Sequence, residues 1–349
     1  MDFTTSLIKW YENDHRLLPW RETSDPYFIW LSEVILQQTR IDQGTNYYIR
    51  FIEHFPTLKD LASASEDEVL KLWQGLGYYS RARNLHFAAK FILNSYNGQF
   101  PDTYDAILSL KGVGEYTASA IASIAFNLPY AAIDGNVYRV LSRFTGLDAP
   151  IDTGEGKKMF RELANHFLDQ KNPGIYNQAV MELGAVVCTP QSPDCKNCPL
   201  NDSCVALRDK TISMLPVKIG RTVQRNRYFN YLDITSGSHT FIHQRKGGDI
   251  WHGLFEFPLI ETVAEIGVDE LILNKEWGDL FDGIKPVITG WERVPVHLLS
   301  HLKIYTRFIR IDLPEEFDLS EKYRKVLKKD IFKFAVPRLV ERYLINRYE

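Results

Sequence analysis

Apolar residues recur at spacings of three and four along the first 210 residues, the period of helices that bury one face. The clearest segments with this period are 28–38, 69–73, 85–93, 116–126, 137–144 and 159–167. Glycine and proline separate these segments, and Ser65 followed by Glu68 has the form of a capping box at a helix start. The pattern therefore predicts an almost entirely helical region over residues 1–210.

The pattern becomes strand-like from residue 228 onward. Apolar and polar residues alternate over 302–308, while 263–274 and 336–346 have helical periodicity. We therefore expect an α+β domain over residues 228–349.

Basic residues are concentrated between the two regions, although the chain as a whole is nearly neutral. Residues 211–227 carry Lys218, Arg221, Arg225 and Arg227 and no acid, which suits either a basic linker or a merely solvated connector. The formal net charge is only −3, from 41 basic and 44 acidic side chains. Net charge alone therefore does not point to nucleic acid, but a basic face on a neutral protein can still bind it.

Composition is that of a globular protein. Hydrophobic residues make up 45% and charged residues 24% of the chain, which excludes a disordered or collagen-like protein. The longest apolar run, residues 118–133, is interrupted by Asn127 and Pro129 and is too short to span a membrane. The first residues lack a basic stretch followed by a long apolar one, so we expect neither secretion nor membrane insertion.

All four cysteines fall within one short segment, with the spacing Cys188-x6-Cys195-x2-Cys198-x5-Cys204. Disulfides are uncommon inside cells, so this clustering predicts a metal centre. Zinc and an iron–sulfur cluster both take four thiolate ligands. Zinc ribbons generally have two close pairs of cysteines and this segment has one, so the compact, unequal spacing favours a [4Fe–4S] cluster. Zinc and four unrelated buried thiols are the alternatives.

The segment Leu110-Lys111-Gly112-Val113-Gly114 lies between two helical stretches. Two glycines separated by one residue permit a tight turn, and the amides that open the next helix then face outward, where the helix dipole favours an anion. A phosphate of a nucleic-acid backbone fits this geometry. On its own, however, the motif is also typical of an ordinary helix–helix turn.

The hairpin, Asp134 about twenty residues after it, and the cysteine cluster together resemble the endonuclease III superfamily of base-excision DNA glycosylases. Residues 19–39 and 75–82 are similar to the adenine-removing branch of this superfamily, the MutY-type glycosylases. Residues 251–258 match the first block of the Nudix-like C-terminal domain of that branch. Because the paired glutamates of a full Nudix box are missing, we expect no pyrophosphatase activity.

This resemblance covers nearly the whole chain and implies a multidomain protein. It consists of an all-α helix-hairpin-helix glycosylase domain with an iron–sulfur cluster loop, plus a C-terminal α+β Nudix-like domain. Residues 1–210 would form the all-α catalytic region, 211–227 the basic linker, and 228–349 the Nudix-like domain that recognises 8-oxoguanine. Within the catalytic region, the six-helix barrel would span about 20–125, and the cluster-bearing subdomain would comprise 1–19 and 126–210.

By the same resemblance, the protein is a monofunctional DNA glycosylase of base excision repair. It would hydrolyse the N-glycosidic bond of adenine mispaired with 8-oxoguanine or guanine in double-stranded DNA. The four cysteines would bind one [4Fe–4S] cluster. We expect the protein to be a monomer of bacterial type. It would be cytoplasmic, associated with the nucleoid through DNA, and would make no membrane contact.

Two carboxyl groups are candidates for the chemistry, because cleavage of a glycosidic bond requires protonation of the leaving group and stabilisation of positive charge on the sugar. Glu33 lies among apolar residues, whose desolvation would raise its pKa as a general acid requires; an exposed helical glutamate is the alternative. Asp134 precedes a predicted helix start, where it would also serve as an N-cap. The resemblance assigns proton transfer to adenine N7 to Glu33 and stabilisation of the oxocarbenium-like sugar to Asp134. Bifunctional relatives carry a lysine where this chain has Tyr116, so we expect no Schiff base.

The resemblance also implies contacts with the substrate and with DNA. The residues concerned are Trp20, Arg21, Gln38, Thr39, Leu76, Tyr78, Gly112, Gly114, Asn136, Ser300 and His301. Arg21 would line the adenine pocket, and Tyr78 would wedge into the base stack. Ser300 and His301 would read 8-oxoguanine, next to Leu299 in place of the family's phenylalanine. For Leu76 and Tyr78, ordinary helix packing is the alternative.

Two other functions are compatible with parts of this pattern. A mismatch-specific thymine or uracil glycosylase can also carry tyrosine at the hairpin, but Glu33 and the extra C-terminal domain argue against it. A catalytically silent DNA-binding protein could use the hairpin and the cluster as a sensor, but the acid pair is complete in this chain.

Overall fold

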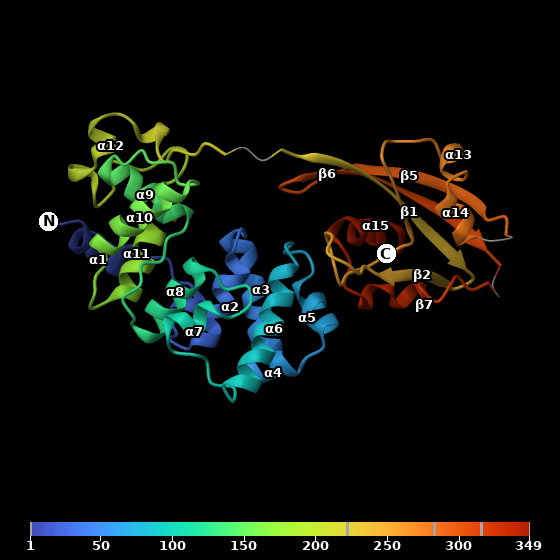
Figure 1. The fold of residues 1–349 in the computed structure, drawn as a ribbon, viewed down its shortest axis with the longest axis horizontal. Coiled ribbons are helices and arrows are strands. Elements are labelled where there is room, and N and C mark those ends of the chain that lie inside the picture. The colour runs from blue at the N-terminus through green and yellow to red at the C-terminus, as the bar shows by residue number, and fades with distance from the viewer. Residues whose placement is uncertain (1, 221–222, 282–283, 315–316, 349) are drawn as a thin grey trace. The chain divides into compact units, whose positions relative to one another are not determined.

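The computed structural model describes residues 2–220, 223–281, 284–314 and 317–348. These residues pack into two compact units, which Figure 1 shows. The first unit comprises the chain up to Ala64 together with Asn84–Gly220, and the second comprises Ser65–Arg83 together with the chain from residue 223 onward. Residues 65–83 therefore pack with the C-terminal part, although they lie inside the region that the sequence pattern predicts to be helical.

The first unit is helical, as the sequence pattern predicts. Its helices are α1 (Phe3–Asp14), α2 (Pro26–Leu36), α3 (Ile41–His54), α4 (Leu58–Ser63), most of α6 (Ser80–Ser95), α7 (Tyr104–Leu108), α8 (Glu115–Phe126), α9 (Gly135–Thr145), α10 (Gly154–Phe167), α11 (Pro173–Val186) and α12 (Val205–Arg208). Short 3-10 helices lie at η1 (Pro19–Arg21), η2 (Asn201–Ser203) and η3 (Ile212–Met214). Local sequence explains several helix starts, because the Asp2 side chain accepts a hydrogen bond from the Thr5 amide at 2.8 Å and Thr57 forms a capping box with Asp60.

A core of apolar side chains joins α1, α9, α10 and α11. Leu7, Phe160, Leu183 and Tyr176 are buried within it. Burial of one large apolar side chain stabilises a fold by roughly 1.5–3 kcal/mol. This core fixes the positions of α9 and α11, which carry residues of the site described below.

The predicted hairpin is present between α7 and α8. Gly112 has a φ of +85°, and a Cβ atom at this position would lie 2.6 Å from the Cβ of Asn84. Both the backbone conformation and the close approach therefore require glycine. Gly114 is the N-cap of α8 and offers no capping side chain to the amides of the first turn.

The second unit contains helix α5 (Glu66–Trp73), the start of α6 and a mixed sheet. Its strands, among the described residues, are β1 (Arg225–Ser236), β2 (His239–Gln244), β3 (Phe255–Glu256), β4 (Leu259–Thr262), β5 (Val287–Leu298), β6 (Leu302–Leu313) and β7 (Arg324–Leu327). The strand order is β3-β2-β1-β6-β5, with β4 paired to β1 and β7 paired to β2. Strands β1 and β6 are parallel, and the other pairs are antiparallel. The predicted capping box opens α5, where the Ser65 amide donates to the Glu68 carboxylate at 2.8 Å.

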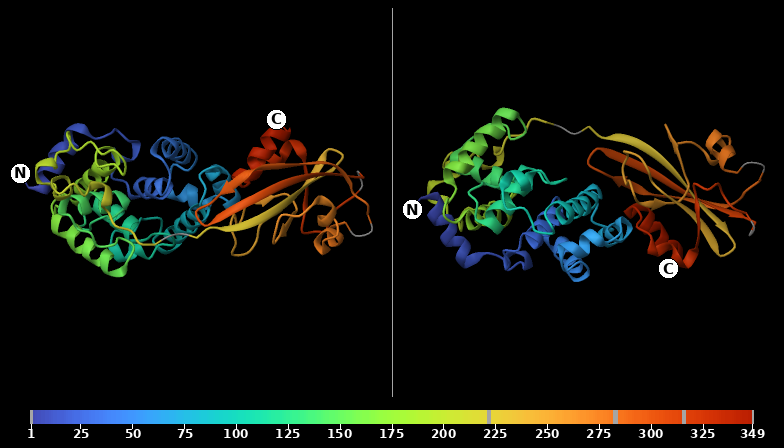
Figure 2. Two further views of the ribbon diagram at one scale, coloured as in Figure 1. Left: turned by 90° about the horizontal axis from the view of Figure 1, so that it is seen from above. Right: turned by 60° about the horizontal axis from the view of Figure 1, so that its bottom comes forward.

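Helices cover both faces of the sheet, as Figures 1 and 2 show. Helix α15 (Arg338–Tyr348), preceded by the 3-10 helix η4 (Lys328–Lys333), packs on the face where Ile304 and Phe308 are buried. Helices α13 (Val268–Leu271) and α14 (Lys275–Leu280) pack on the other face with Ile309 and Ile311. The predicted strand over 302–308 and the predicted C-terminal helix are therefore confirmed, whereas the helical pattern over 263–274 is realised only in the short α13.

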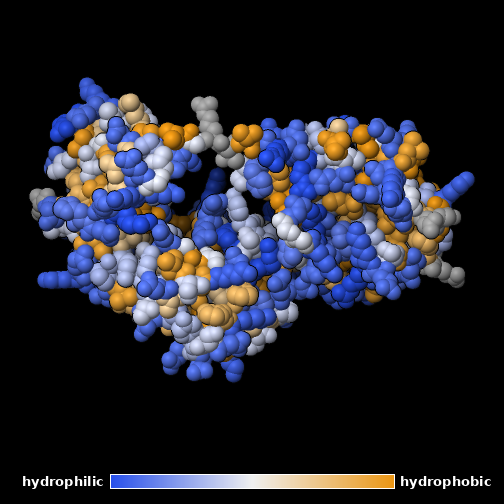
Figure 3. Space-filling view, in the orientation of Figure 1, coloured by the Kyte–Doolittle hydropathy of each residue, from blue (hydrophilic) through white to orange (hydrophobic). Residues whose placement is uncertain are grey.

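The surface in Figure 3 is mainly hydrophilic, with apolar side chains scattered over both units. The large apolar residues that are exposed include Leu17, Tyr78 and Trp291. Within the described ranges, none of the helices combines the length and the apolar character needed to cross a membrane.

Candidate active site

A cavity of about 610 Å³ lies within the first unit and brings together nine of the eighteen predicted site residues. The predicted site residues that line it are Trp20, Arg21, Glu33, Gln38, Thr39, Gly114, Tyr116, Asp134 and Asn136. They come from η1, from α2 and the turn after it, from the start of α8, and from the N-terminus of α9. Side chains far apart in the sequence therefore converge because α2, α8, α9 and α11 pack around one space.

Glu33 is a carboxyl group of the cavity whose pKa lies near neutral pH. It projects from α2, between the buried residues Ser32 and Val34. Burial raises the pKa of Glu33 to about 7; a hydrogen bond from Tyr116 opposes this rise, and the charge of Asp134 adds to it. About half of the Glu33 side chains would therefore be protonated at pH 7, so this group can donate a proton to a bound molecule.

Asp134 is the N-cap of α9, as its position in the sequence predicts. Its Oδ1 accepts hydrogen bonds from the amides of Asn136 at 2.9 Å and Val137 at 2.8 Å, and its Oδ2 accepts one from the Asn136 side chain at 2.7 Å. Burial raises the pKa of Asp134, and these hydrogen bonds oppose the rise. The capping role and a role in the cavity are compatible, because the same carboxylate lines the cavity wall.

A chain of hydrogen bonds connects Asp134 to the cysteine segment. Asn136 donates to Asp134 and accepts from Nη2 of Arg139 at 2.7 Å. The buried guanidinium of Arg139 also donates to the carbonyl oxygen of Cys188 at 2.7 Å and to that of Gly184 at 2.8 Å. The cavity and the first cysteine therefore share one polar network.

Tyr116 lies on the cavity wall near both carboxyl groups. Its hydroxyl contacts Sδ of Met181 at 3.2 Å. Burial, with the nearby charges of Glu33 and Asp134, raises the pKa of Tyr116 well above its usual value. The phenol therefore stays neutral and can act as a hydrogen-bond donor, but it supplies no amine nucleophile.

Glu182 of α11 is a functional candidate that the sequence reasoning missed. It is almost completely buried, and its carboxylate accepts hydrogen bonds from the amide, Nε and Nη2 of Arg16 and from Nη2 of Arg21, at 2.7–3.1 Å. Burial opposes ionisation, but these hydrogen bonds outweigh it and hold the pKa of Glu182 at about 2. Since a carboxylate has about four lone-pair positions, this one is saturated by the two arginines and serves to orient them. A single acid in a predominantly apolar helix was the available signal, the same one that pointed to Glu33.

The remaining predicted residues lie outside this cavity. Gly112 is at the hairpin turn, and the side chain of Leu76 is buried in the second unit. Tyr78, Ser300 and His301 line a different cavity of about 320 Å³ within the second unit. Tyr78 is half exposed there, and Ser300 Oγ lies 3.2 Å from Nδ1 of His301.

The four cysteines line one small cavity, together with Arg143 of α9. Burial, together with a smaller contribution from the neighbouring thiols, raises the pKa of Cys198 to about 11. The buried guanidinium of Arg143 lies 3.5 Å from Sγ of Cys188 and donates to the carbonyl oxygens of Thr189 and Pro190. Four soft ligands that converge beside a buried cation fit a centre with a net negative charge, such as an iron–sulfur cluster. Among the described residues, no three metal-ligating side chains are grouped around a single-ion position.

Known proteins resemble both parts of the chain. Residues 31–166 match the family described as HhH-GPD superfamily base excision DNA repair protein, and residues 231–346 match the NUDIX domain. An adenine DNA glycosylase of Buchnera aphidicola subsp. Acyrthosiphon pisum is 32% identical over 349 residues, which are 99% of this chain and 97% of that protein. The adenine DNA glycosylase of Homo sapiens is 45% identical over 213 residues, which are 58% of this chain and 39% of that protein.

Solved structures show the same helical fold. A thermostable thymine-DNA glycosylase superposes with a TM-score of 0.54 at 28% identity, over 59% of this chain and 95% of that one. Endonuclease III, in a trapped covalent intermediate with DNA, superposes with a TM-score of 0.52 at 24% identity, over 59% of this chain and 94% of that one. The helical domain of this chain therefore has the endonuclease III fold, and the C-terminal domain is Nudix-like.

Proposed function

Since this chain belongs to the adenine DNA glycosylases, enzymes of base excision repair, we propose that it hydrolyses the N-glycosidic bond of adenine opposite 8-oxoguanine or guanine. The observation that carries the proposal is the pair of carboxyl groups in the cavity of the first unit. Glu33, with a pKa of about 7, can donate a proton, while Asp134 is held at a helix N-terminus by three hydrogen bonds. Glycoside hydrolysis requires one carboxyl group that donates a proton and one that stabilises positive charge on the sugar.

The proposed reaction takes place on an adenosine that has left the base stack. The carboxylic acid of Glu33 gives its proton to N7 of adenine, and the electron pair of the C1′–N9 bond leaves with the base. The carboxylate of Asp134 stabilises the positive charge that develops on the sugar. Water then adds to C1′, and its proton passes to the Glu33 carboxylate, which restores the acid.

Tyr116 supports a monofunctional reaction. Strand cleavage by a Schiff base requires an amine at the reacting carbon, and a phenol cannot supply one. Tyr116, neutral because of its burial, is therefore assigned a hydrogen-bonding role beside Glu33 and Asp134.

Arg21 is proposed to contact the adenine ring. It lines the cavity beside Trp20, and Glu182 holds its guanidinium in place. A fixed guanidinium next to an aromatic wall suits the flat, acceptor-rich edge of a purine. Glu182 is then a positioning residue that acts through Arg21.

Cys188, Cys195, Cys198 and Cys204 are proposed to hold one [4Fe–4S] cluster. When bound, the cluster would tie the four thiolates and their loop together and would carry no electron in a net hydrolysis. Arg143 would offset the negative charge of the thiolates, and Arg139 would anchor the backbone of Cys188.

The proposed substrate is double-stranded DNA, and we propose that the protein binds it as a monomer. In a bacterial-type cell, DNA binding would place the protein at the nucleoid. The amides at Gly112–Gly114 would take a backbone phosphate. Gln38 and Thr39 would lie near the opposite strand, and Ser300 and His301 would contact 8-oxoguanine.

Single-turnover excision on four duplexes tests the proposal. We expect alkali-induced strand scission with A:8-oxoguanine and A:G duplexes, and none with T:G or U:G. The Glu33→Gln variant should bind the A:8-oxoguanine duplex but excise at least about 100-fold more slowly, because an amide cannot deliver the proton. Release of thymine or uracil without release of adenine would overturn the assignment, as would wild-type excision by the Glu33→Gln variant.

A further inference from the structure

Residues 65–83 are held to the C-terminal part of the second unit by side-chain hydrogen bonds. Nε2 of Gln74 donates to Glu341 at 2.7 Å, and its Oε1 accepts from the amide of Val336 at 3.2 Å. Nζ of Lys71 donates to the carbonyl oxygen of Phe334 at 3.2 Å. These contacts connect positions more than 260 residues apart in the sequence. The segment and the sheet domain therefore present one preassembled surface.

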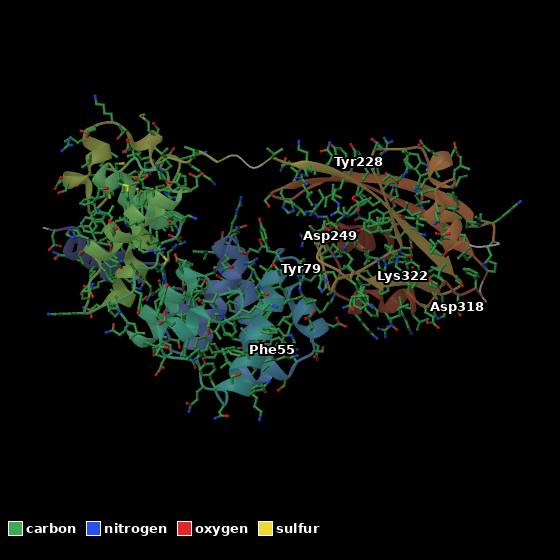
Figure 4. The ribbon with its side chains drawn as sticks, in the orientation of Figure 1. Phe55, Tyr79, Tyr228, Asp249, Asp318 and Lys322 are labelled. Atoms are coloured by element: carbon green, nitrogen blue, oxygen red, sulfur yellow. The ribbon has the colours of Figure 1, made fainter. Side chains whose placement is uncertain are left out.

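The cavity of about 320 Å³ is built by three pieces of this surface. Residues 77–83 form one wall, residues 249–251 a second, and the turn 298–301 between β5 and β6 a third. Tyr79 and Asp249, labelled in Figure 4, belong to the first two walls. The cavity falls at the lower end of the size range of small-molecule and base pockets.

Two aromatic residues of this cavity have a left-handed backbone. The φ angle is +47° at Tyr78 and +61° at Trp251. Bulky side chains rarely adopt this conformation, and where they do so the surrounding structure must enforce it, which is typical of functional sites. The sequence already pointed to Tyr78, but it assigned no role to Trp251.

Both aromatic rings are fixed by their neighbours. The ring of Trp251 makes edge contacts with Phe229 and His297, with centroid distances of 6.0 and 5.8 Å. The guanidinium of Arg81 lies 5.6 Å from the centre of the Tyr78 ring. Arg83 donates to the carbonyl oxygen of His252 and so ties the wall that carries Tyr78 to the loop that carries Trp251. The side chains of Tyr78 and Trp251 are therefore held in fixed positions in the cavity that Ser300 and His301 also line.

We propose that Trp251 is a third reading residue for the nucleotide opposite adenine, an aromatic wall that contacts the 8-oxoguanine nucleotide alongside Tyr78 and the 298–301 turn. This inference rests on the proposed function. Because Ser300 and His301 hold 8-oxoguanine against this wall and have no equivalent hold on guanine, the aromatic face of Trp251 adds more affinity for 8-oxoguanine than for guanine. Arg83 is the positioning residue of this arrangement.

The test measures binding separately from excision. Duplexes with an abasic-site analogue opposite 8-oxoguanine or guanine give two dissociation constants, and their ratio is the discrimination. Trp251→Leu keeps apolar volume but removes the aromatic face, and we expect it to reduce the ratio about tenfold, as for the loss of one base–aromatic contact. Trp251→Phe should restore most of the ratio.

Trp291→Leu is the matched control, since Trp291 is an exposed tryptophan of β5 outside this cavity. It should leave the ratio unchanged. Its single-turnover excision from the A:G duplex and its thermal unfolding midpoint should also stay close to wild type, because Trp291 is exposed and Glu33 and Asp134 belong to the first unit.

Two results would overturn the proposal. One is a ratio for Trp251→Leu within twofold of wild type. The other is an equal loss for 8-oxoguanine and guanine duplexes, which would assign Trp251 a structural role. A wild-type protein that excises no adenine opposite 8-oxoguanine would instead refute the proposed function, so the two failures are distinguishable.

Discussion

Glu33 and Glu182 are carboxyl groups on apolar helices of the same unit, yet their pKa values are driven in opposite directions. Burial raises the pKa of Glu33 to about 7, and the charge of Arg21 only partly offsets this rise. Glu182 is bound by Arg16 and Arg21, which hold its pKa at about 2. The neighbouring groups, rather than the residue type, therefore decide which acid carries a proton at neutral pH.

Excision should depend on pH through Glu33. An acid with a raised pKa is protonated below that value and loses its proton above it. As far as Glu33 is concerned, the excision rate should therefore be highest below pH 7. Above pH 7 the single-turnover rate should fall about tenfold per pH unit. A rate that stays constant between pH 6 and 9 would show that Glu33 is not the acid.

Removal of the Glu182 charge should destabilise the first unit. In Glu182→Gln, two arginines would keep their charges beside a neutral amide, and the loss of a buried ion pair costs about 3–5 kcal/mol. Urea unfolding measures this change in the free energy of unfolding. The matched control is Glu115→Gln, which removes the exposed pair with Arg161 and should cost at most about 1 kcal/mol. Equal effects of the two substitutions would contradict this interpretation.

Helix α9 supports two sites, the cavity and the cysteine segment. Its first turn binds the side chain of Asp134, and its middle binds the backbone of the cysteine segment. Arg139 makes this connection through Asn136 and the carbonyl oxygen of Cys188. A substitution that disturbs the cysteine segment is therefore expected to affect the cavity as well, and the reverse.

Arg139→Gln tests this coupling. We expect the wild-type protein to contain about four iron atoms per chain, and we expect the variant to lose iron and to excise adenine about 10–100-fold more slowly, as is usual for residues that support metal ligands. Iron analysis and single-turnover excision are the measurements. Arg208→Gln, an exposed arginine near the same cysteines, should change neither. Stoichiometric zinc in the wild-type protein would contradict the cluster itself.

The sequence predicts local features of these elements well and long-range ones poorly. The capping box at Ser65, the hairpin at Gly112 and the strand around Phe308 follow from neighbouring residues, and all three are present. The convergence of Arg16 and Arg21 on Glu182 joins positions more than 160 residues apart. No periodicity within a short window contains that information.

On the scale of the whole molecule, the two compact units do not follow the order of the chain. Residues 65–83 pack with the C-terminal part, so the catalytic carboxyl groups proposed here lie in one unit and Tyr78 lies in the other. The sequence pattern assigns residues 65–83 to the helical region because α5 and α6 have the same periodicity as their neighbours. Long-range contacts, such as those of Gln74 and Lys71 with the distant C-terminal residues, reveal the division.

A premature stop codon in the linker would therefore damage more than the domain it deletes. A chain that ends at residue 220 would still contain Gln74 and Lys71, but their partners at Glu341 and Phe334 would be gone. We expect amide hydrogen exchange over residues 65–83 to be much faster in this fragment than in the full chain, while exchange in α11 stays slow. Equal protection of residues 65–83 in both proteins would contradict this expectation. In genetic terms, nonsense and missense changes after residue 223 should then share a phenotype with missense changes in α5, although the two groups lie at distant places in the gene.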